Sequence, residues 1–389
     1  MRVLFLIANY GQGSGGHYHS LNHISNALGN ELNVSIVSIG SKESPLLNTN
    51  PFFTKHLYFS KFSQYFNFKK EFNSFLNELK PDVCHFFDTD SLNSVLLVNS
   101  LKNISVVLNK CGGPNPIRNK WQYVNNLILF SKENFDFFKS RECLYKGMNV
   151  HLIPSRVKRV SNENIFDHPE KRDNSVITFV RVSRLGGAYE KTLLDSFNLI
   201  ERLNHDTIKV RLIVVGRIQN IERFEVLKNN ALERELPFTF ITDKRATMGA
   251  SFLYLSDIII GTGRSLMEGL SVNKPCLVPV KTSDIPVLLT NDNFNCLFST
   301  NFSERGVLNS DEEQSYLFLK KVIKQKEAYK SLSKYSEEIF NSNFDITLAK
   351  KRYQNVYFNI NSTKSKTSLR SKNRLYLIKE LLNLFKGKS

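Results

Sequence analysis

Residues 257–275 read DIIIGTGRSLMEGLSVNKP, and this stretch decides the predicted fold. Three isoleucines predict a short buried strand, and Gly261, Thr262 and Gly263 follow where the strand turns into a helix. A glycine turn before a helix N-terminus presents backbone N–H groups to an anion. Glu268, about one turn inside the helix, suits hydrogen bonds from ribose hydroxyls. The alternative for Glu268 taken alone is a solvated helix residue.

The surrounding residues repeat this alternation of apolar strand and helical segment. The predicted strands are SVITFVRV (175–182), KVRLIVVG (209–216), PFTFI (237–241) and PCLVPV (275–280), with helices at about 190–204, 220–235 and 264–272. Earlier strands are RVLFLIA (2–8), NVSIVSI (33–39), PDVCHFF (81–87), ISVVLN (104–109), NLILFS (126–131) and NVHLIP (149–154). Such alternation predicts parallel sheets in doubly wound α/β domains.

The alternation divides into two blocks. We expect an N-terminal Rossmann-like domain at 1–154, a polar linker at 155–174 and a second Rossmann-like domain at 175–345. A C-terminal helix and basic amphipathic tail would occupy 346–389. Two such domains face each other across a cleft, and ligands bind at strand C-termini near a topological switch point.

Cations follow the first strand of the second block. RVSRLGGAYEK (181–191) contains Arg181, Arg184 and Lys191, and two fixed cations at a strand end can hold a diphosphate. Gly216 in VVGR (214–217) makes another strand-to-loop turn. Taken singly, Arg184 and Lys191 would more often be surface charges, so the prediction depends on the order of all three segments.

A glycine-rich loop follows the first strand. It includes Gly15 and Gly16 before a helix, where backbone amides can approach a phosphate. The spacing is not that of a dinucleotide fingerprint, and the alternative is a flexible turn. Asp88 and Asp90 in DTD (88–90) are interpreted as helix caps, with Asp90 the expected cap, and not as metal ligands.

Together these motifs resemble the GT-B-fold glycosyltransferases, specifically the large retaining group numbered family 4. The resemblance covers roughly residues 1–345. The matching motifs are Gly15 and Gly16 followed by His17, PDVCH (81–85), Arg184-Leu185 with Lys191 at a gap two residues longer, Gly261-Thr262-Gly263, Glu268, and Asn273-Lys274-Pro275.

Two positions depart from the family pattern. The first family glutamate, which in relatives contacts the donor sugar, is Ile260 here. Relatives often have His-Gly where this chain has Cys111-Gly112, and Lys110 or the backbone amides of that turn are candidates for part of that role. The resemblance therefore supports nucleotide-sugar binding more strongly than the usual catalytic details.

The resemblance implies front-face glycosyl transfer in which Arg184, Lys191 and helix-end amides stabilise the departing nucleoside diphosphate without a metal. The implied catalytic residues are Arg184, Lys191 and Lys110. The implied donor-binding residues are Gly15, Gly16, Gly216, Gly261, Thr262, Gly263, Arg264, Ser265 and Glu268. No cofactor is expected besides the nucleotide-sugar substrate, most simply a UDP-sugar.

Charge and the C-terminus suggest a membrane surface. The formal net charge is +17, and residues 361–389 hold eight cations and one acid. In 371–386 a helix would place Leu375, Ile378, Leu382 and Phe385 on one face, the pattern of an interfacial helix on an anionic membrane. The alternative is a helix that packs back on the first domain. An aromatic-rich stretch, 52–75, suits core, acceptor or membrane contacts.

The preferred interpretation is a cytoplasmic, peripheral glycosyltransferase of cell-surface polysaccharide biosynthesis that acts on a glycan or lipid-linked acceptor with retention of configuration. Five scattered cysteines without CxxC spacing fit a reduced compartment. The alternatives are a non-catalytic nucleotide-sugar or glycan-binding relative, suggested by Ile260, and a sugar-nucleotide epimerase of the same fold. No nucleic-acid-binding motif accompanies the charge, so nucleic acid is not an expected partner.

Overall fold

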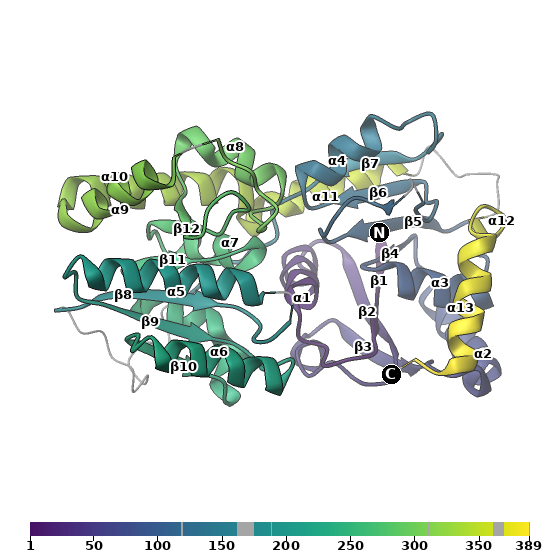
Figure 1. The fold of residues 1–389 in the computed structure, drawn as a ribbon. Coiled ribbons are helices and arrows are strands. Elements are labelled where there is room, and N and C mark those ends of the chain that lie inside the picture. The colour runs from purple at the N-terminus through teal and green to yellow at the C-terminus, as the bar shows by residue number, and fades with distance from the viewer. Residues whose placement is uncertain (118–119, 162–174, 188, 310, 361–368, 389) are drawn as a thin grey trace. The chain divides into compact units, whose positions relative to one another are not determined.

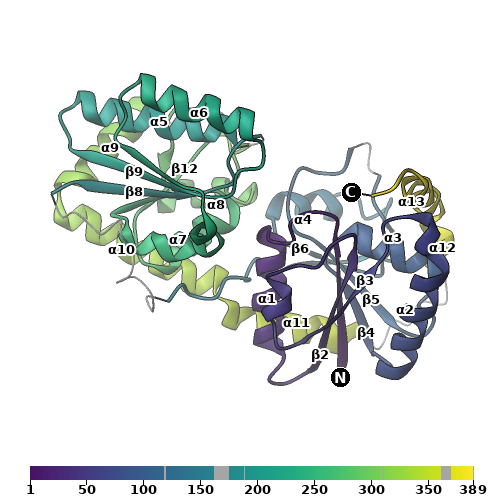
Figure 2. The same ribbon diagram turned by 90° about the horizontal axis from the view of Figure 1, so that it is seen from below.

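The computed structural model describes residues 1–117, 120–161, 175–187, 189–309, 311–360 and 369–388. Contacts divide the chain into two units, each built on a largely parallel sheet with helices on both faces (Figures 1 and 2). Unit 1 comprises Met1–Arg156 and Ile346–Ser389, and unit 2 comprises Val157–Asp345. In the described part of the chain, no helix has both the length and the apolar content needed to cross a lipid bilayer.

Unit 1 contains a seven-stranded sheet of order β3-β2-β1-β4-β5-β6-β7, with every pair parallel. Its strands are β1 Arg2–Asn9, β2 Asn33–Gly40, β3 Phe53–Tyr58, β4 Val83–Phe86, β5 Ser105–Lys110, β6 Asn126–Leu129 and β7 Asn149–Leu152. Its α-helices are α1 Gly16–Leu28, α2 Tyr65–Leu79, α3 Thr89–Val98, α4 Lys132–Lys139, α11 Ile346–Ile360, α12 Leu369–Lys372 and α13 Arg374–Lys386. The strand order reverses direction between β1 and β4, which is the topological switch point.

Unit 2 contains a six-stranded sheet of order β10-β9-β8-β11-β12-β13, in which only β13 runs antiparallel to its neighbour. Its strands are β8 Ile177–Val182, β9 Val210–Val215, β10 Phe238–Ile241, β11 Ile258–Ile260, β12 Cys276–Val278 and β13 Val287–Leu288. Its α-helices are α5 Glu190–His205, α6 Ile221–Glu233, α7 Gly263–Ser271, α8 Asn291–Ser299, α9 Glu312–Lys324 and α10 Lys326–Ile339. The switch point lies between β8 and β11.

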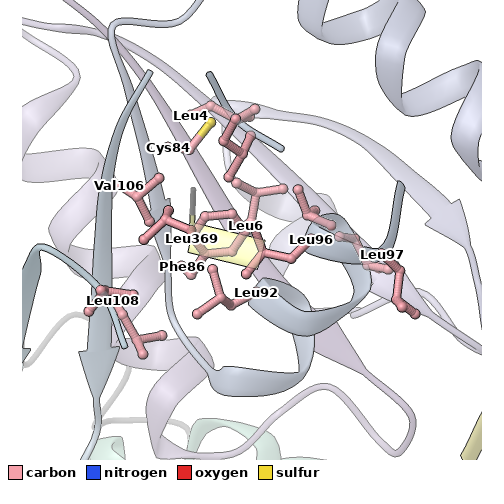
Figure 3. Packing of buried hydrophobic residues seen from close by; sticks show 14 of the residues in the cluster. Leu4, Leu6, Cys84, Phe86, Leu92, Leu96, Leu97, Val106, Leu108 and Leu369 are labelled. Atoms are coloured by element: carbon pink, nitrogen blue, oxygen red, sulfur yellow. The ribbon is translucent and has the colours of Figure 1, made fainter. Parts of the chain in front are cut away.

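Strand β1 explains why the sheet is covered on both faces. Seven of its eight residues are buried, because alternate side chains enter different cores. Leu4 and Leu6 pack with Phe86 and with α3, as Figure 3 shows, whereas Phe5 packs on the face covered by α1 and α11. The two-sided burial produces the continuous apolar run that predicted this strand.

The unit boundaries differ from the expected ones. Residues 155–157 are buried, and Val157 bridges Asp345, so the chain leaves unit 1 through packed structure where an exposed linker was expected. Most of the predicted linker, 162–174, lies outside the described residues. Because the chain returns at Ile346, the segment expected to be a separate tail belongs to unit 1.

The returning segment is held by buried contacts. Helix α11 reaches the sheet through Tyr357, whose hydroxyl lies 2.7 Å from His85 Nδ1 on β4. Leu369, Leu377 and Leu384 of α12 and α13 join the core between β1 and α3. The expected alternative, a C-terminal helix that packs on the first domain, is therefore confirmed for this face of α13.

Candidate functional site

Unit 2 assembles three loops at the carboxyl ends of β8, β9 and β11. Gly216 after β9 lies so close to the loop after β8 that an added Cβ would lie 1.6 Å from the Ser183 carbonyl oxygen. Leu185 and Ile218 then form a parallel bridge that joins the same loops. Only glycine allows this approach, so Gly216 fixes the shape of the edge; it has no side chain to offer a ligand.

The turn after β11 is formed by the predicted glycine segment. Gly261 packs against the Leu266 backbone, with an added Cβ only 2.7 Å from its nitrogen, and Gly263 has a left-handed φ of 51°. Thr262 and Ser265 cap α7 reciprocally in a capping box. The turn therefore holds the N-terminus of α7 at the switch point, where helix N–H groups and the helix dipole favour an anion.

Glu268 is not a solvated helix residue. Its carboxylate accepts a 2.8 Å hydrogen bond from Arg264 Nε, and the two side chains are only 13% and 10% exposed. Burial lowers the pKa of the Arg264 guanidinium, and the neighbouring carboxylate opposes that shift. The pair fixes a charged acceptor one turn inside α7. This pair was not predicted from the sequence, although the i,i+4 spacing of Arg264 and Glu268 could have revealed it.

Arg184 and Lys191 have separate local partners. Arg184 is exposed in the loop after β8, where it donates to the Tyr189 hydroxyl at 2.8 Å and lies over the Tyr189 ring. Lys191, in the first turn of α5, bonds Asp195 at 2.9 Å. Both residues follow the carboxyl end of β8, as predicted. The Lys191 side chain is 56% exposed to solvent. No described contact joins them directly.

Arg181 differs from the expected role of a strand-end cation. It lies inside β8, only 1% exposed, and its guanidinium donates to Ser196 and to two oxygens of Thr192. Burial lowers its pKa to about 10. Arg181 therefore attaches α5 to the sheet and is not available to a diphosphate.

Unit 1 presents its glycine loop at the switch point between β1 and β4. Gly13 has a φ of 63° and packs against Ser44, whose hydroxyl donates to the Gly13 carbonyl oxygen at 2.5 Å. Gly15 is the N-cap residue of α1, and Gly16 is the first helical residue. The expected turn and helix start are confirmed; phosphate binding there stays a prediction.

The DTD segment is a helix start. Asp88, not Asp90 as expected, is the N-cap of α3, and its carboxylate accepts from Ser91 N at 2.6 Å and Ala8 N at 2.8 Å. Burial raises the Asp88 pKa to about 6. In the described residues, no cluster of three potential metal ligands occurs.

Lys110 is the last residue of β5 and is buried. Its ammonium donates to the Gly112 carbonyl at 2.5 Å and lies 5.4 Å from the Trp121 ring centroid. Cys111 Sγ contacts the Phe87 carbonyl oxygen. Lys110 thus supports the turn at Cys111 and Gly112, and its catalytic role stays a prediction.

A polar cluster that the sequence did not reveal lies beside the glycine loop. Glu380 of α13, only 2% exposed, accepts hydrogen bonds from Ser94 at 3.0 Å and Lys388 at 2.5 Å. Lys388 also lies over the ring of Tyr10, within the loop after β1. Residues this distant in sequence give no spacing signal.

A cavity of about 410 Å³ in unit 2 lies away from the three-loop edge at the carboxyl ends of β8, β9 and β11. Ile177, Asp257 and Ile258 line it, so it lies at the amino ends of β8 and β11. The predicted donor residues occupy the opposite, carboxyl ends. The cavity is therefore unrelated to the three-loop edge.

Comparison with known proteins shows the fold. A glycosyltransferase from Rickettsia africae matches 93% of this chain and 99% of its own at 14% identity and a TM-score of 0.63. Alr3699/HepE from Anabaena, in complex with UDP and glucose, matches 92% and 100% at 13% identity and 0.66. A UDP-GlcNAc 2-epimerase from Neisseria meningitidis, bound to UDP-GlcNAc, matches 92% and 100% at 13% identity and 0.58. No family model and no curated protein matches the sequence. The chain has the GT-B fold.

Proposed function

We propose that this chain transfers a sugar from a nucleoside-diphosphate donor, most simply a UDP-sugar, to a glycan or lipid-linked acceptor. The main support is the Arg264–Glu268 pair on α7, directly behind the glycine turn at the switch point of unit 2. A helix N-terminus suits a diphosphate, and a fixed carboxylate suits a ribose. Anabaena HepE, of similar fold, binds UDP.

In the proposed reaction the donor's bond from its anomeric carbon to the diphosphate oxygen breaks, and the acceptor oxygen bonds to that carbon. The proton of the acceptor hydroxyl passes to the departing diphosphate oxygen. Arg184 and Lys191 would stabilise the charge that develops on the departing diphosphate. We propose a front-face reaction that retains configuration. The coupling constant of the new anomeric proton in the NMR spectrum of the product tests this step separately.

Titration calorimetry with UDP, GDP and ADP tests donor binding. We expect one nucleotide to bind, and Glu268→Ala to weaken that binding by at least tenfold, because a charged hydrogen bond contributes about 1.5–3 kcal/mol. Glu233→Ala, on the exposed side of α6, is the matched control and should bind normally. Absence of binding to all three nucleotides by the folded protein would refute the proposal.

Two other functions remain candidates on specific observations. Ile260, at the family glutamate position, favours a non-catalytic binding protein, and the epimerase similarity favours an epimerase. Donor hydrolysis or transfer would eliminate the first. A changed sugar in the nucleotide product without any acceptor would identify the second. A screen of nucleotide-sugars with membrane-extracted lipid acceptors separates all three.

The proposed setting is the inner face of the plasma membrane, in cell-surface polysaccharide biosynthesis. Exposed large apolar side chains on α13 support this setting; they include Leu375, Leu382 and Phe385. Cell fractionation that recovers the protein only in the supernatant, at low salt, would count against this setting.

A further inference from the structure

Helix α13 has two apolar sides, of which only one is buried in the core of unit 1. Leu377 and Leu384 are buried in the core. The outward side holds the α13 stripe, whose members are Leu375, Ile378, Leu382 and Phe385, exposed at 80%, 47%, 58% and 62%. Their spacing places them along one line of the helix. The stripe therefore lies on a helix that the core of unit 1 already holds in place, so a partner can bind it without any further folding of the chain.

Aromatic side chains extend the α13 stripe across unit 1. The Phe385 ring stacks on Phe62 at 4.2 Å between centroids, Phe62 neighbours Tyr65 at 5.9 Å, and Tyr65 meets Phe66 edge-on at 5.3 Å. Phe66, on α2, is 75% exposed. In both ribbon views α13 lies against α3 in the same outer layer as α2 (Figures 1 and 2). We call the α13 stripe with Phe66 the docking face.

Cations accompany the docking face. The exposed cations within 61–72 and 369–388 are Lys61, Lys69, Lys70, Arg370, Lys372, Arg374, Lys379 and Lys386. The acids of these two segments are Glu71, which is half-buried, and Glu380, which is buried and bonded to Lys388. The surface is therefore strongly positive beside its apolar residues.

We infer that the docking face binds an anionic lipid bilayer, a partner that deepens the proposed function by assigning its membrane contact to named residues. Leu and Phe side chains would enter the acyl boundary, while flanking lysines reach the phosphates. A second copy of the chain fits poorly, because a two-fold contact would place this cation-rich face against itself.

The experiment is flotation of the full chain with vesicles of phosphatidylcholine alone and of phosphatidylcholine mixed with phosphatidylglycerol. We expect binding to the mixed vesicles only, and release near 1 M salt, where the Debye length is about 3 Å. Leu382→Gln should weaken partitioning roughly tenfold. Lys379→Gln combined with Lys386→Gln should weaken it roughly 30-fold, because each cation near the surface strengthens binding about fivefold.

Matched controls lie in unit 2. Leu232 on α6 is exposed at 55%, and Lys324 is an exposed cation at the end of α9, so Leu232→Gln and Lys324→Gln should leave vesicle binding unchanged. Every variant should bind UDP with the affinity of the wild type in titration calorimetry. This result separates a failure of the membrane inference from a failure of the proposed function. Equal binding to both vesicle types would overturn the inference. So would a dimer, measured by light scattering, that Leu382→Gln dissociates.

Discussion

The Lys388 ammonium lies 4.6 Å from the Tyr10 ring centroid, although 378 residues separate the two in sequence. The same ammonium bonds Glu380 Oε1 at 2.5 Å, and the Lys388 backbone N–H donates to the Ser60 carbonyl. Tyr10 belongs to the glycine loop after β1. The last described residue of the chain is thus joined to the glycine loop that follows β1.

Removal of this ammonium should destabilise unit 1. Lys388→Met leaves Glu380 buried without its ion-pair partner, so we expect a loss of about 3–5 kcal/mol in the free energy of unfolding. Lys386→Met, two residues earlier and exposed, should change it by less than about 0.5 kcal/mol. Urea unfolding measures both. Equal losses of stability in the two variants would show that the Glu380–Lys388 pair does not contribute to the free energy of unfolding.

Gly216→Ala should distort the three-loop edge of unit 2. The added Cβ would meet the Ser183 carbonyl oxygen, so the loops after β8 and β9 must separate. We expect a loss of about 1–3 kcal/mol together with weaker UDP binding. Gly11→Ala is the control, since nothing lies within 4 Å of its added Cβ. Unchanged melting and calorimetry for Gly216→Ala would contradict the geometry.

His85 should make unit 1 sensitive to mild acid. Burial lowers its folded-state pKa to about 3, below the ordinary value of 6.5, so folding favours the neutral ring. This contribution to stability is complete above pH 6.5 and decreases as the pH falls toward 3. At pH 5 the loss is about 2 kcal/mol relative to pH 7.5.

His85→Gln should remove that portion of the pH dependence while lowering stability at pH 7.5, because the bond to Tyr357 changes. Urea unfolding at both pH values measures the difference. His205→Gln, at the C-terminal end of α5, is the control variant. If the free energy of unfolding decreased equally between pH 7.5 and pH 5 in His85→Gln and in wild type, His85 would be excluded as the source of the decrease.

The sequence predicted most strands of both sheets because two-sided burial leaves continuous apolar runs. It missed β3, FTKHLY, an edge strand with mostly half-exposed residues. It identified the glycine turn before α7 and the position of Glu268 about one turn inside that helix, which depend on local spacing. It missed the role of Arg181 and the Tyr10–Lys388 contact, since both depend on which side chains the folded chain brings together.

Arg184 should matter more for turnover than for nucleotide affinity. It is exposed and held over Tyr189, so its removal leaves the fold intact. If Arg184 stabilises charge on the departing diphosphate, Arg184→Ala should lower kcat roughly 100-fold with a smaller change in the Kd for UDP. Arg184→Lys should restore part of the rate. Arg223→Ala, an exposed arginine on α6, is the matched control. Equal losses in kcat and UDP affinity would instead assign Arg184 to ground-state binding.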